Sequence, residues 1–396
     1  MNENETEFPI QTIFNCFSKL ANLQEFLLSF VECNNPDDEE NFNAILKFFD
    51  NEYDEILENY SYYSLILHLV ESVSISRLLN INISKKLCII LDYLIINFKM
   101  KEMFKPKIIF SIFENNNYIL LHLYNLNMLS IKLFIRKINC NSSRHLINYF
   151  VPELKKYHNT EIIQKLVFKH DLEELIEDNN TNYEELENLR EESHHEQTIA
   201  KIIRNDDLES FSEYLSKTNT NINSQIHFSV YETNVFLNET VSLIEYSMAF
   251  GAINIFKYLF ISKAKLTNNS SKYSIMGGNY DIIHFLESDK RVSFGETCLE
   301  YAILFHRYEI YEYLLSATKH YLEHDQELEN IFHSMNFIHL REILIHRPSY
   351  FIDAFKSSFI IRILGGSVLL YLFKLYIEAR NDINSKNSIS SFIYCH

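Results

Sequence analysis

Glycine, proline and tryptophan are scarce in this chain of 396 residues, which has six glycines, five prolines and no tryptophan. Glycine-rich phosphate loops need several glycines within a short span. The glycines stand at positions 251, 277, 278, 295, 365 and 366, and neither G-x-G-x-x-G nor G-x-x-x-x-G-K-[ST] occurs. The sequence therefore argues against nucleotide enzymes of the Rossmann and P-loop kinds.

The chain also lacks a long apolar run. Residues 1–8 are polar and acidic, and the longest apolar stretch, Leu87–Phe98, is interrupted by Asp92. We therefore expect neither a secretion signal nor a membrane span. The six cysteines are scattered without a C-x-x-C pair, which is typical of reduced thiols in a cytosolic protein. These features predict a cytoplasmic location.

Basic side chains are outnumbered by acidic ones, with 36 Lys and Arg against 53 Asp and Glu, so the net charge is −17. An acidic surface repels phosphate backbones, and we therefore expect no binding of nucleic acid. The apolar fraction of 47% is sufficient for a sizeable core.

Apolar residues recur at positions i, i+3 and i+4 through most of the chain, which predicts an all-α fold. Polar clusters interrupt this pattern, and the acidic one near residue 190 is the best domain boundary. A possible strand pair lies near 226–237. The predicted regions are an irregular helical N-terminal region at 1–177, an acidic linker at 178–197, a degenerate repeat array at 198–378 and a C-terminal tail at 379–396.

A set of three apolar residues recurs through the second half of the chain. The last member of each set follows one apolar residue by one position and another by four positions, as in Ile255, Tyr258 and Leu259. The last members are Leu215, Leu259, Leu286, Leu314, Leu344 and Phe373. After a first interval of 44 residues, which holds the possible strands, the intervals are 27, 28, 30 and 29 residues. This regularity indicates an internal repeat. The residues that we expect in the repeat core are Ile255, Leu259, Ile282, Leu286, Ile310, Leu314, Leu340 and Leu344.

In each unit, a residue of a type common in turns stands eight positions before the last apolar residue of the set. The predicted turn residues are Asp207, Gly251, Gly278, His306, Asn336 and Gly365. These residue types are enriched where a left-handed or otherwise non-helical residue ends a helix. An apolar residue precedes each turn, so each unit is expected to be a helix, a tight turn and a helix. Such units bury their apolar faces by stacking, which predicts an α-solenoid.

The clearest unit resembles an ankyrin-type repeat. Leu299-Glu300-Tyr301-Ala302 resembles the first-helix L-H-L-A, and His306 takes the place of the turn glycine. Glu309-Ile310-Tyr311 followed by Leu314-Leu315 resembles E-I-V-x-x-L-L. The T-P-L-H signature is absent, and the units are shorter than the 33 residues of ankyrin repeats.

The run from about Thr198 to Leu315 resembles a large family of ankyrin-containing proteins of parabasalids, of the Trichomonas type, which carry a domain of unknown function. Among the segments that carry this likeness are Ser242-Leu243-Ile244-Glu245-Tyr246, Ile255-Phe256-Lys257-Tyr258-Leu259 and Asp281-Ile282-Ile283-His284-Phe285-Leu286. The resemblance implies a protein-interaction scaffold or adaptor without catalysis or cofactor. It identifies neither the partner nor the oligomeric state. Another possibility is that the chain is a structural subunit of a larger assembly.

The alternative is a zinc-dependent hydrolase. His320-Tyr321-Leu322-Glu323-His324 fits H-x-x-E-H and resembles the inverzincin metalloproteases. Two histidines on one helical face can share a zinc ion while the intervening glutamate acts as general base. Such a site needs a third protein ligand, and the sequence does not point to one. We therefore expect a solvated segment without metal.

Other polar residues have simpler interpretations. His194 and His195 are adjacent and face different directions on a helix, so we place them in a solvated polar linker. Arg204, His333 and Arg362 share one position of the first helices. We interpret this position as a partly exposed helix face, with a functional groove as the alternative.

Overall fold

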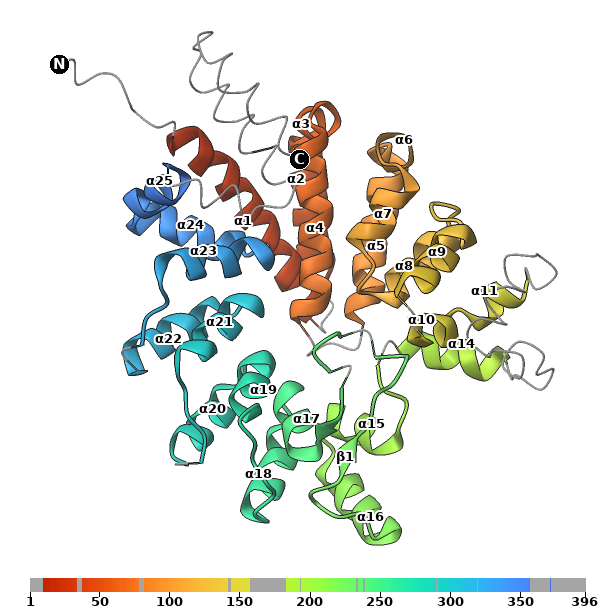
Figure 1. The fold of residues 1–396 in the computed structure, drawn as a ribbon, viewed down its shortest axis with the longest axis vertical. Helices are drawn as coiled ribbons and strands as arrows, with labels where there is room; N and C mark the ends of the chain where they lie inside the picture. Colours follow the sequence, from red (N-terminus) through yellow and green to blue (C-terminus); the bar gives the residue numbers. More distant parts are fainter. Residues whose placement is uncertain are drawn as a thin grey trace.

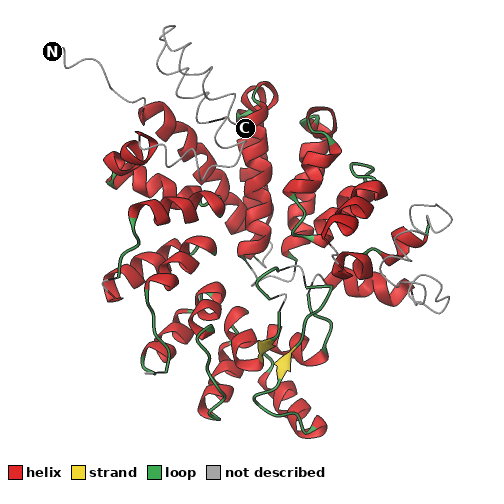
Figure 2. Ribbon diagram, in the orientation of Figure 1, coloured by secondary structure: helices red, strands yellow, loops and turns green. Residues whose placement is uncertain are grey.

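In the computed structural model the described residues are 10–33, 38–77, 82–141, 144–156, 183–192, 194–232, 234–237, 239–289, 291–318, 320–356 and 371. These residues form 23 α-helices and two strands of two residues each (Figure 2). The all-α class is therefore confirmed. The predicted tail at 379–396 lies outside the described residues.

The N-terminal region consists of helices of uneven length. They are α1 (Ile10–Glu32), α2 (Asp38–Asn51), α3 (Tyr53–Glu58), α4 (Tyr60–Ser76), α5 (Ile83–Asn97), α6 (Met100–Met103), α7 (Pro106–Ile112), α8 (Asn117–Asn125), α9 (Ile131–Asn141), α10 (Arg144–Tyr149) and α11 (Val151–Lys155). In α4, 13 of the 17 residues are buried. A helix buried on most sides lies in the interior of its domain, so α4 is the central element of this region.

The second half consists of helix pairs. After α14 (Tyr183–Glu192) the pairs are α15 (Thr198–Arg204) with α16 (Leu208–Thr218), α17 (Leu243–Ala249) with α18 (Ile253–Ile261), α19 (Ser270–Gly277) with α20 (Tyr280–Glu287), α21 (Glu296–Leu304) with α22 (Tyr308–Thr318), and α23 (His324–His333) with α24 (Phe337–His346), followed by α25 (Pro348–Lys356). The helix, turn and helix order predicted for each unit is present in all five of these pairs.

A small antiparallel sheet lies between the first two pairs. Strand β1 (Gln225–Ile226) pairs with β2 (Val241–Ser242). The sequence placed a possible strand pair near 226–237. The first strand lies at the start of that range, whereas the second lies beyond its end.

Successive pairs stack with like helices side by side (Figure 1). The first helices pack closely on one another, α17 on α19 and α19 on α21, whereas the second helices α16, α18, α20 and α22 diverge. Gly277 permits the closest of these approaches, because a Cβ atom there would lie 1.9 Å from the carbonyl oxygen of Met248. The stack is therefore curved, with the first helices on its inner side.

One residue in each turn between paired helices has a left-handed backbone. The residues and their φ values are Asp206 (49°), Gly251 (64°), Gly278 (69°), His306 (55°) and Met335 (51°). Gly251, Gly278 and His306 stand where the sequence predicted them. In the first and last pairs the left-handed residue comes one position earlier than predicted. It stands nine residues, rather than eight, before Leu215 and before Leu344.

The predicted turn residues of those two pairs act as helix caps. The Asp207 side chain accepts a hydrogen bond from the N–H of Ser210 (3.0 Å), and Asn336 accepts one from the N–H of His339 (3.1 Å). Such caps satisfy N–H groups that the first turn of a helix leaves without a partner. The sixth predicted turn residue, Gly365, lies outside the described residues.

Hydrogen bonds also link each turn to the next. The Asp206 carboxylate accepts from the first N–H groups of α18 at 3.0 Å. Asn279 Nδ2 donates to the carbonyl of Gly251 (3.2 Å), and Asn336 Nδ2 donates to that of Ile303 (2.9 Å). Because each bond crosses from one helix pair to its neighbour, the turns fix the stacking register.

The N-terminal region folds back on the last helix pair, with α1 lying along α24 (Figure 1). The rings of Phe17 and Phe337 stack with centroids 5.7 Å apart. Gln24 Oε1 accepts a hydrogen bond from the N–H of Ile338 (2.9 Å). The first described helix of the chain is thus joined to one of the last.

At the other end of the array, α14 joins the N-terminal region. Arg190 Nη2 lies 2.9 Å from Glu153 Oε2, both side chains are buried, and Arg190 also donates to the carbonyl of Tyr149. The helices therefore follow one another around a ring, and the C-terminal end of α4 lies near its middle (Figure 1). In the ranges that the structure describes, no helix has the length and apolar character that a membrane crossing requires.

Candidate functional site

The H-x-x-E-H motif does not form one helical face. His320 lies in the loop after α22, Glu323 is the N-cap residue of α23, and His324 is the first residue of that helix. All three side chains are exposed. Among the described residues, no group of three or more His, Cys, Asp or Glu side chains could hold a metal ion. The geometry therefore gives no support to the alternative of a zinc-dependent hydrolase.

His194 and His195 are 4% and 3% exposed, so the prediction of a solvated linker is wrong at these positions. His194 Nδ1 lies 3.1 Å from Glu232 Oε1, and His195 Nε2 donates to the carbonyl of His227 (2.6 Å). Both partners belong to the segment between the first two helix pairs. The sequence could not reveal this burial because the covering residues come more than thirty positions later.

Glu232 is the charged centre of this buried cluster. Burial alone raises the pKa of its carboxyl group, but the neighbouring His194 and the N–H of Asn234 hold that pKa below its ordinary value. Asn234 also donates from Nδ2 to the carbonyl of Ile75 at the end of α4 (2.6 Å). These contacts therefore connect His194 and His195, and the segment between the first two helix pairs, to the C-terminal end of α4.

The position shared by Arg204, His333 and Arg362 is not uniform in the structure. Arg204 is half-buried and donates from Nη1 to the carbonyl of His195 (3.0 Å) and to the hydroxyl of Tyr246 (2.9 Å). His333 is exposed, and Arg362 lies outside the described residues. Arg204 thus belongs to the buried cluster around Glu232, whereas His333 is exposed at the end of α23.

His306 joins the array to the N-terminal region. Its ring is 3% exposed and donates from Nε2 to the carbonyl of Ser334 (2.7 Å), while Nδ1 accepts from the Ser76 hydroxyl of α4 (3.3 Å). Arg77, directly after α4, donates to the His306 carbonyl (2.8 Å). Burial lowers the pKa of His306 to about 3; the bond to Ser334 opposes this shift and the charge of Arg77 assists it. The ring is therefore neutral at physiological pH.

A second buried carboxylate escaped the sequence prediction. Glu327 of α23 is hydrogen bonded by Tyr311 (2.7 Å), His339 (2.9 Å), Arg347 (2.9 Å) and Tyr350 (2.6 Å). Burial raises the pKa of this carboxyl group, but the bonds from His339 and Arg347 outweigh burial and hold the pKa well below its ordinary range. The donors belong to four different segments, so no local sequence pattern marks the cluster. Its role is to join α22 to α25.

The predicted repeat core lies inside the array. The exposed fraction is at most 5% for every predicted core residue: Ile255, Leu259, Ile282, Leu286, Ile310, Leu314, Leu340 and Leu344. Their side chains are thus unavailable to a partner. A binding site must be sought elsewhere.

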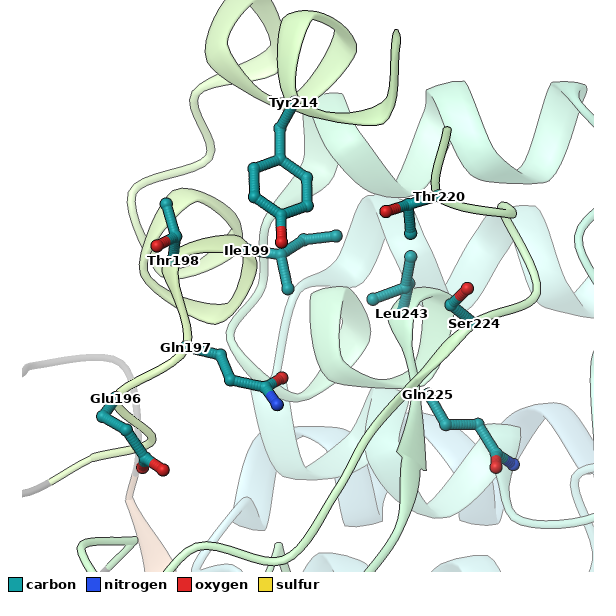
Figure 3. Close-up of a pocket in the computed structure, with 9 residues that line it drawn as sticks. All are labelled: Glu196, Gln197, Thr198, Ile199, Tyr214, Thr220, Ser224, Gln225 and Leu243. Atoms are coloured by element: carbon teal, nitrogen blue, oxygen red, sulfur yellow. The ribbon is translucent and has the colours of Figure 1, made fainter. Parts of the chain in front are cut away.

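A pocket of about 400 Å³ lies between α15, α16 and the start of α17 (Figure 3). Ile199 and Leu243 are buried beneath it, and the Tyr214 hydroxyl points into it toward Ile199. The single acidic side chain among its lining residues is Glu196, which accepts a hydrogen bond from the hydroxyl of Ser229. The pocket offers hydroxyl and amide groups, which suit polar contacts with a ligand or partner.

The outer side of the array carries exposed aromatic rings, where the second helices diverge. Phe260 of α18 faces Phe285 of α20 with centroids 6.0 Å apart, and Tyr280 of α20 faces Tyr313 of α22 at 6.1 Å. We call these four residues the outer aromatic face. Tyr280 and Phe285 remain 38% and 36% exposed. The rings fill the wedges between diverging helices and still present apolar surface to solvent.

Residues 262–341 match the family model of a domain of unknown function, DUF3447. This segment holds α19 to α23, and it includes Tyr280, Phe285 and Tyr313 of the outer aromatic face. The match supports the predicted domain of unknown function, and it names neither ankyrin repeats nor parabasalids. No curated protein and no solved structure matches the chain.

Proposed function

We propose that this chain is a non-catalytic protein-interaction scaffold built as a solenoid of ankyrin-type repeats. Five stacked helix pairs, left-handed residues in their turns and bonds from turn to turn all support this reading of the array. A stack of this kind acts through an extended surface rather than through a catalytic centre. The cytoplasmic location and the relation to parabasalid proteins stay predictions from the sequence.

The outer aromatic face is the observation that carries the proposal. Aromatic rings dominate the energetics of protein interfaces, because they bury a large area at a small cost in conformational entropy. Tyr280 and Phe285 project from α20 into two neighbouring grooves, so a single partner segment can contact both.

The inner side of the array is less available to a partner. His306 and Ser334 lie at the turns and are covered by Ser72, Ser76 and Arg77. The N-terminal region thus occupies this side within the same chain. The outer side is the surface that we assign to partner binding.

Affinity capture from native cytoplasm tests the proposal. The full chain is compared with a variant that carries Tyr280→Ser and Phe285→Ser, and retained proteins are quantified by mass spectrometry. We expect the variant to lose the principal partner. Circular dichroism verifies that it remains helical.

The matched control carries Tyr53→Ser and Tyr60→Ser. These tyrosines are 40% and 42% exposed and each contacts one phenylalanine ring, so the apolar area removed is similar but lies in the N-terminal region. The control should retain the partner. Equal retention by both variants, or no protein retained by the unmodified chain, would refute the proposal.

A further inference from the structure

Two neighbouring parts of the outer aromatic face, which we call grooves, differ in charge. One lies between α18 and α20 and is lined by Phe260 and Phe285, and the other lies between α20 and α22 and is lined by Tyr280 and Tyr313. In the groove between α18 and α20, the chain places its own cations on the aromatic rings. Lys257 Nζ lies 5.4 Å from the ring centroid of Phe285, and the Arg291 guanidinium lies 5.9 Å from that of Phe260. Both distances are within the range of cation–π attraction. This groove therefore shows how a basic side chain rests on the outer aromatic face.

The next groove, between α20 and α22, repeats the same arrangement without a permanent cation. Leu259 and Leu286 are equivalent in the repeat, so His284 occupies the position of Lys257, and Tyr313 occupies that of Phe285. The ring of His284 lies edge-on to that of Tyr313 at 5.4 Å, and Tyr280 completes the aromatic set. The His284 imidazole, whose Nδ1 lies 3.1 Å from Glu287 Oε2, thus stands where the preceding groove has an ammonium group.

Two carboxylates border this second groove. Glu287 accepts a hydrogen bond from the Tyr313 hydroxyl (2.7 Å). Glu309 is exposed on α22, and its charge acts on Tyr280, whose pKa is raised first by burial and then by Glu309. Neither α20 nor α22 contains a lysine or an arginine. Arg307, the residue directly before α22, lies 3.2 Å from Glu32 through Nη1, and it also interacts electrostatically with Glu309 and Tyr280.

We propose that the groove between α20 and α22 binds a lysine- or arginine-rich segment of a partner protein. The inference rests on the proposed scaffold function and adds the chemistry of the partner. The aliphatic stems of two basic side chains pack on Tyr280 and Tyr313. The charged head beside Tyr313 pairs with Glu287, and the one beside Tyr280 pairs with Glu309. Charge complementarity of this kind selects the partner and accelerates its association.

Fluorescence anisotropy with a labelled peptide of twelve alternating arginine and alanine residues tests this assignment. The full chain is compared with a variant that carries Glu287→Gln and Glu309→Gln, which keeps side-chain shape and hydrogen-bond acceptors but removes both charges. The control carries Asp54→Asn and Glu58→Gln, two exposed acidic residues of α3. Both variants have the same net charge, so non-specific attraction of the peptide changes equally.

We expect the dissociation constant to rise about 5- to 10-fold for the groove variant and less than 2-fold for the control, and to rise with salt for the unmodified chain. Equal changes in the two variants, or none, would overturn the assignment of the groove.

The two proposals fail in different ways. If capture depends on Tyr280 and Phe285 but the captured partner binds the groove variant as tightly as the unmodified chain, the scaffold stands and the basic-segment inference is overturned. If the peptide discriminates between the variants as expected but no protein is captured, the groove assignment is supported and the scaffold proposal fails.

Discussion

Replacing Gly277 by alanine tests the close contact between the first helices α17 and α19. A Cβ atom at this position would lie 1.9 Å from the carbonyl oxygen of Met248 and 3.1 Å from that of Ala249. An ordinary contact needs at least about 3.4 Å, so the shortfall is about 1.5 Å. The obstacle is backbone, and no side-chain rotation relieves it, so the two helices must separate.

The free-energy change follows from two opposing effects. Overpacking a core costs about 1–3 kcal/mol, and separation also weakens contacts of the buried neighbours Ile275 and Met276. Alanine regains up to about 1 kcal/mol in helix propensity, and less here because Gly277 is the last residue of α19. We therefore expect a net loss of about 2 kcal/mol in the free energy of unfolding.

Urea unfolding followed by far-ultraviolet circular dichroism measures this change, with the slope of the transition reported beside its midpoint. The control is Gly295→Ala, because a Cβ atom at Gly295 meets nothing within 4 Å. It should change the free energy of unfolding by no more than about 0.5 kcal/mol. A Gly277→Ala protein as stable as the control would refute the close helix approach.

Four further predictions concern the repeat core, the buried residues His306 and Glu327, and the H-x-x-E-H motif. Leu286→Asp places a charge at a fully buried position and should cost about 4 kcal/mol in urea unfolding, whereas a near-neutral result would show that the repeat register is wrong. His306 has a pKa of about 3 when folded and near 6.5 when unfolded, so its contribution to stability is complete above pH 6.5 and is lost as the pH falls toward 3. Between pH 7 and pH 5 this loss is about 2 kcal/mol, and His306→Asn should remove it in paired unfolding curves. Glu327→Gln should cost about 3 kcal/mol, because Arg347 loses its buried counter-charge and an amide cannot accept all the hydrogen bonds that the carboxylate accepts; thermal unfolding unaffected by the change would contradict this. Purified protein should contain less than stoichiometric zinc, and zinc that is lost on His320→Ala would contradict the non-catalytic proposal.

Local patterns predicted much of the array. The spacing of Leu259, Leu286 and Leu314 depends on the helical period and on the stacking of equal units, and both are written in the sequence. The turn types at Gly251 and Gly278 follow from the backbone freedom of glycine. The one-residue shift at Asp206 and Met335 could not be predicted, because the last apolar residue of a unit does not fix where its second helix begins.

Contacts between distant segments could not be predicted from spacing. His194 and His195 have the local surroundings of a solvated linker, yet they are buried because Glu232 and His227 are brought over them by the inserted segment. The H-x-x-E-H motif has the right residues, but α23 begins at His324, so His320 lies outside the helix. Burial and helix boundaries depend on packing partners, which a five-residue pattern does not contain.

The helical period and the repeat spacing by themselves determined that this protein is all-α and that its second half is built from paired helices. Only the tertiary structure decided that α1 closes on α24, that the N-terminal region covers the inner turns, and that Tyr280 and Phe285 face outward. The physical reason is that secondary structure follows from interactions within a few residues. Closure, burial of charge and surface exposure are set by segments that lie from about a dozen to more than three hundred residues apart in the chain.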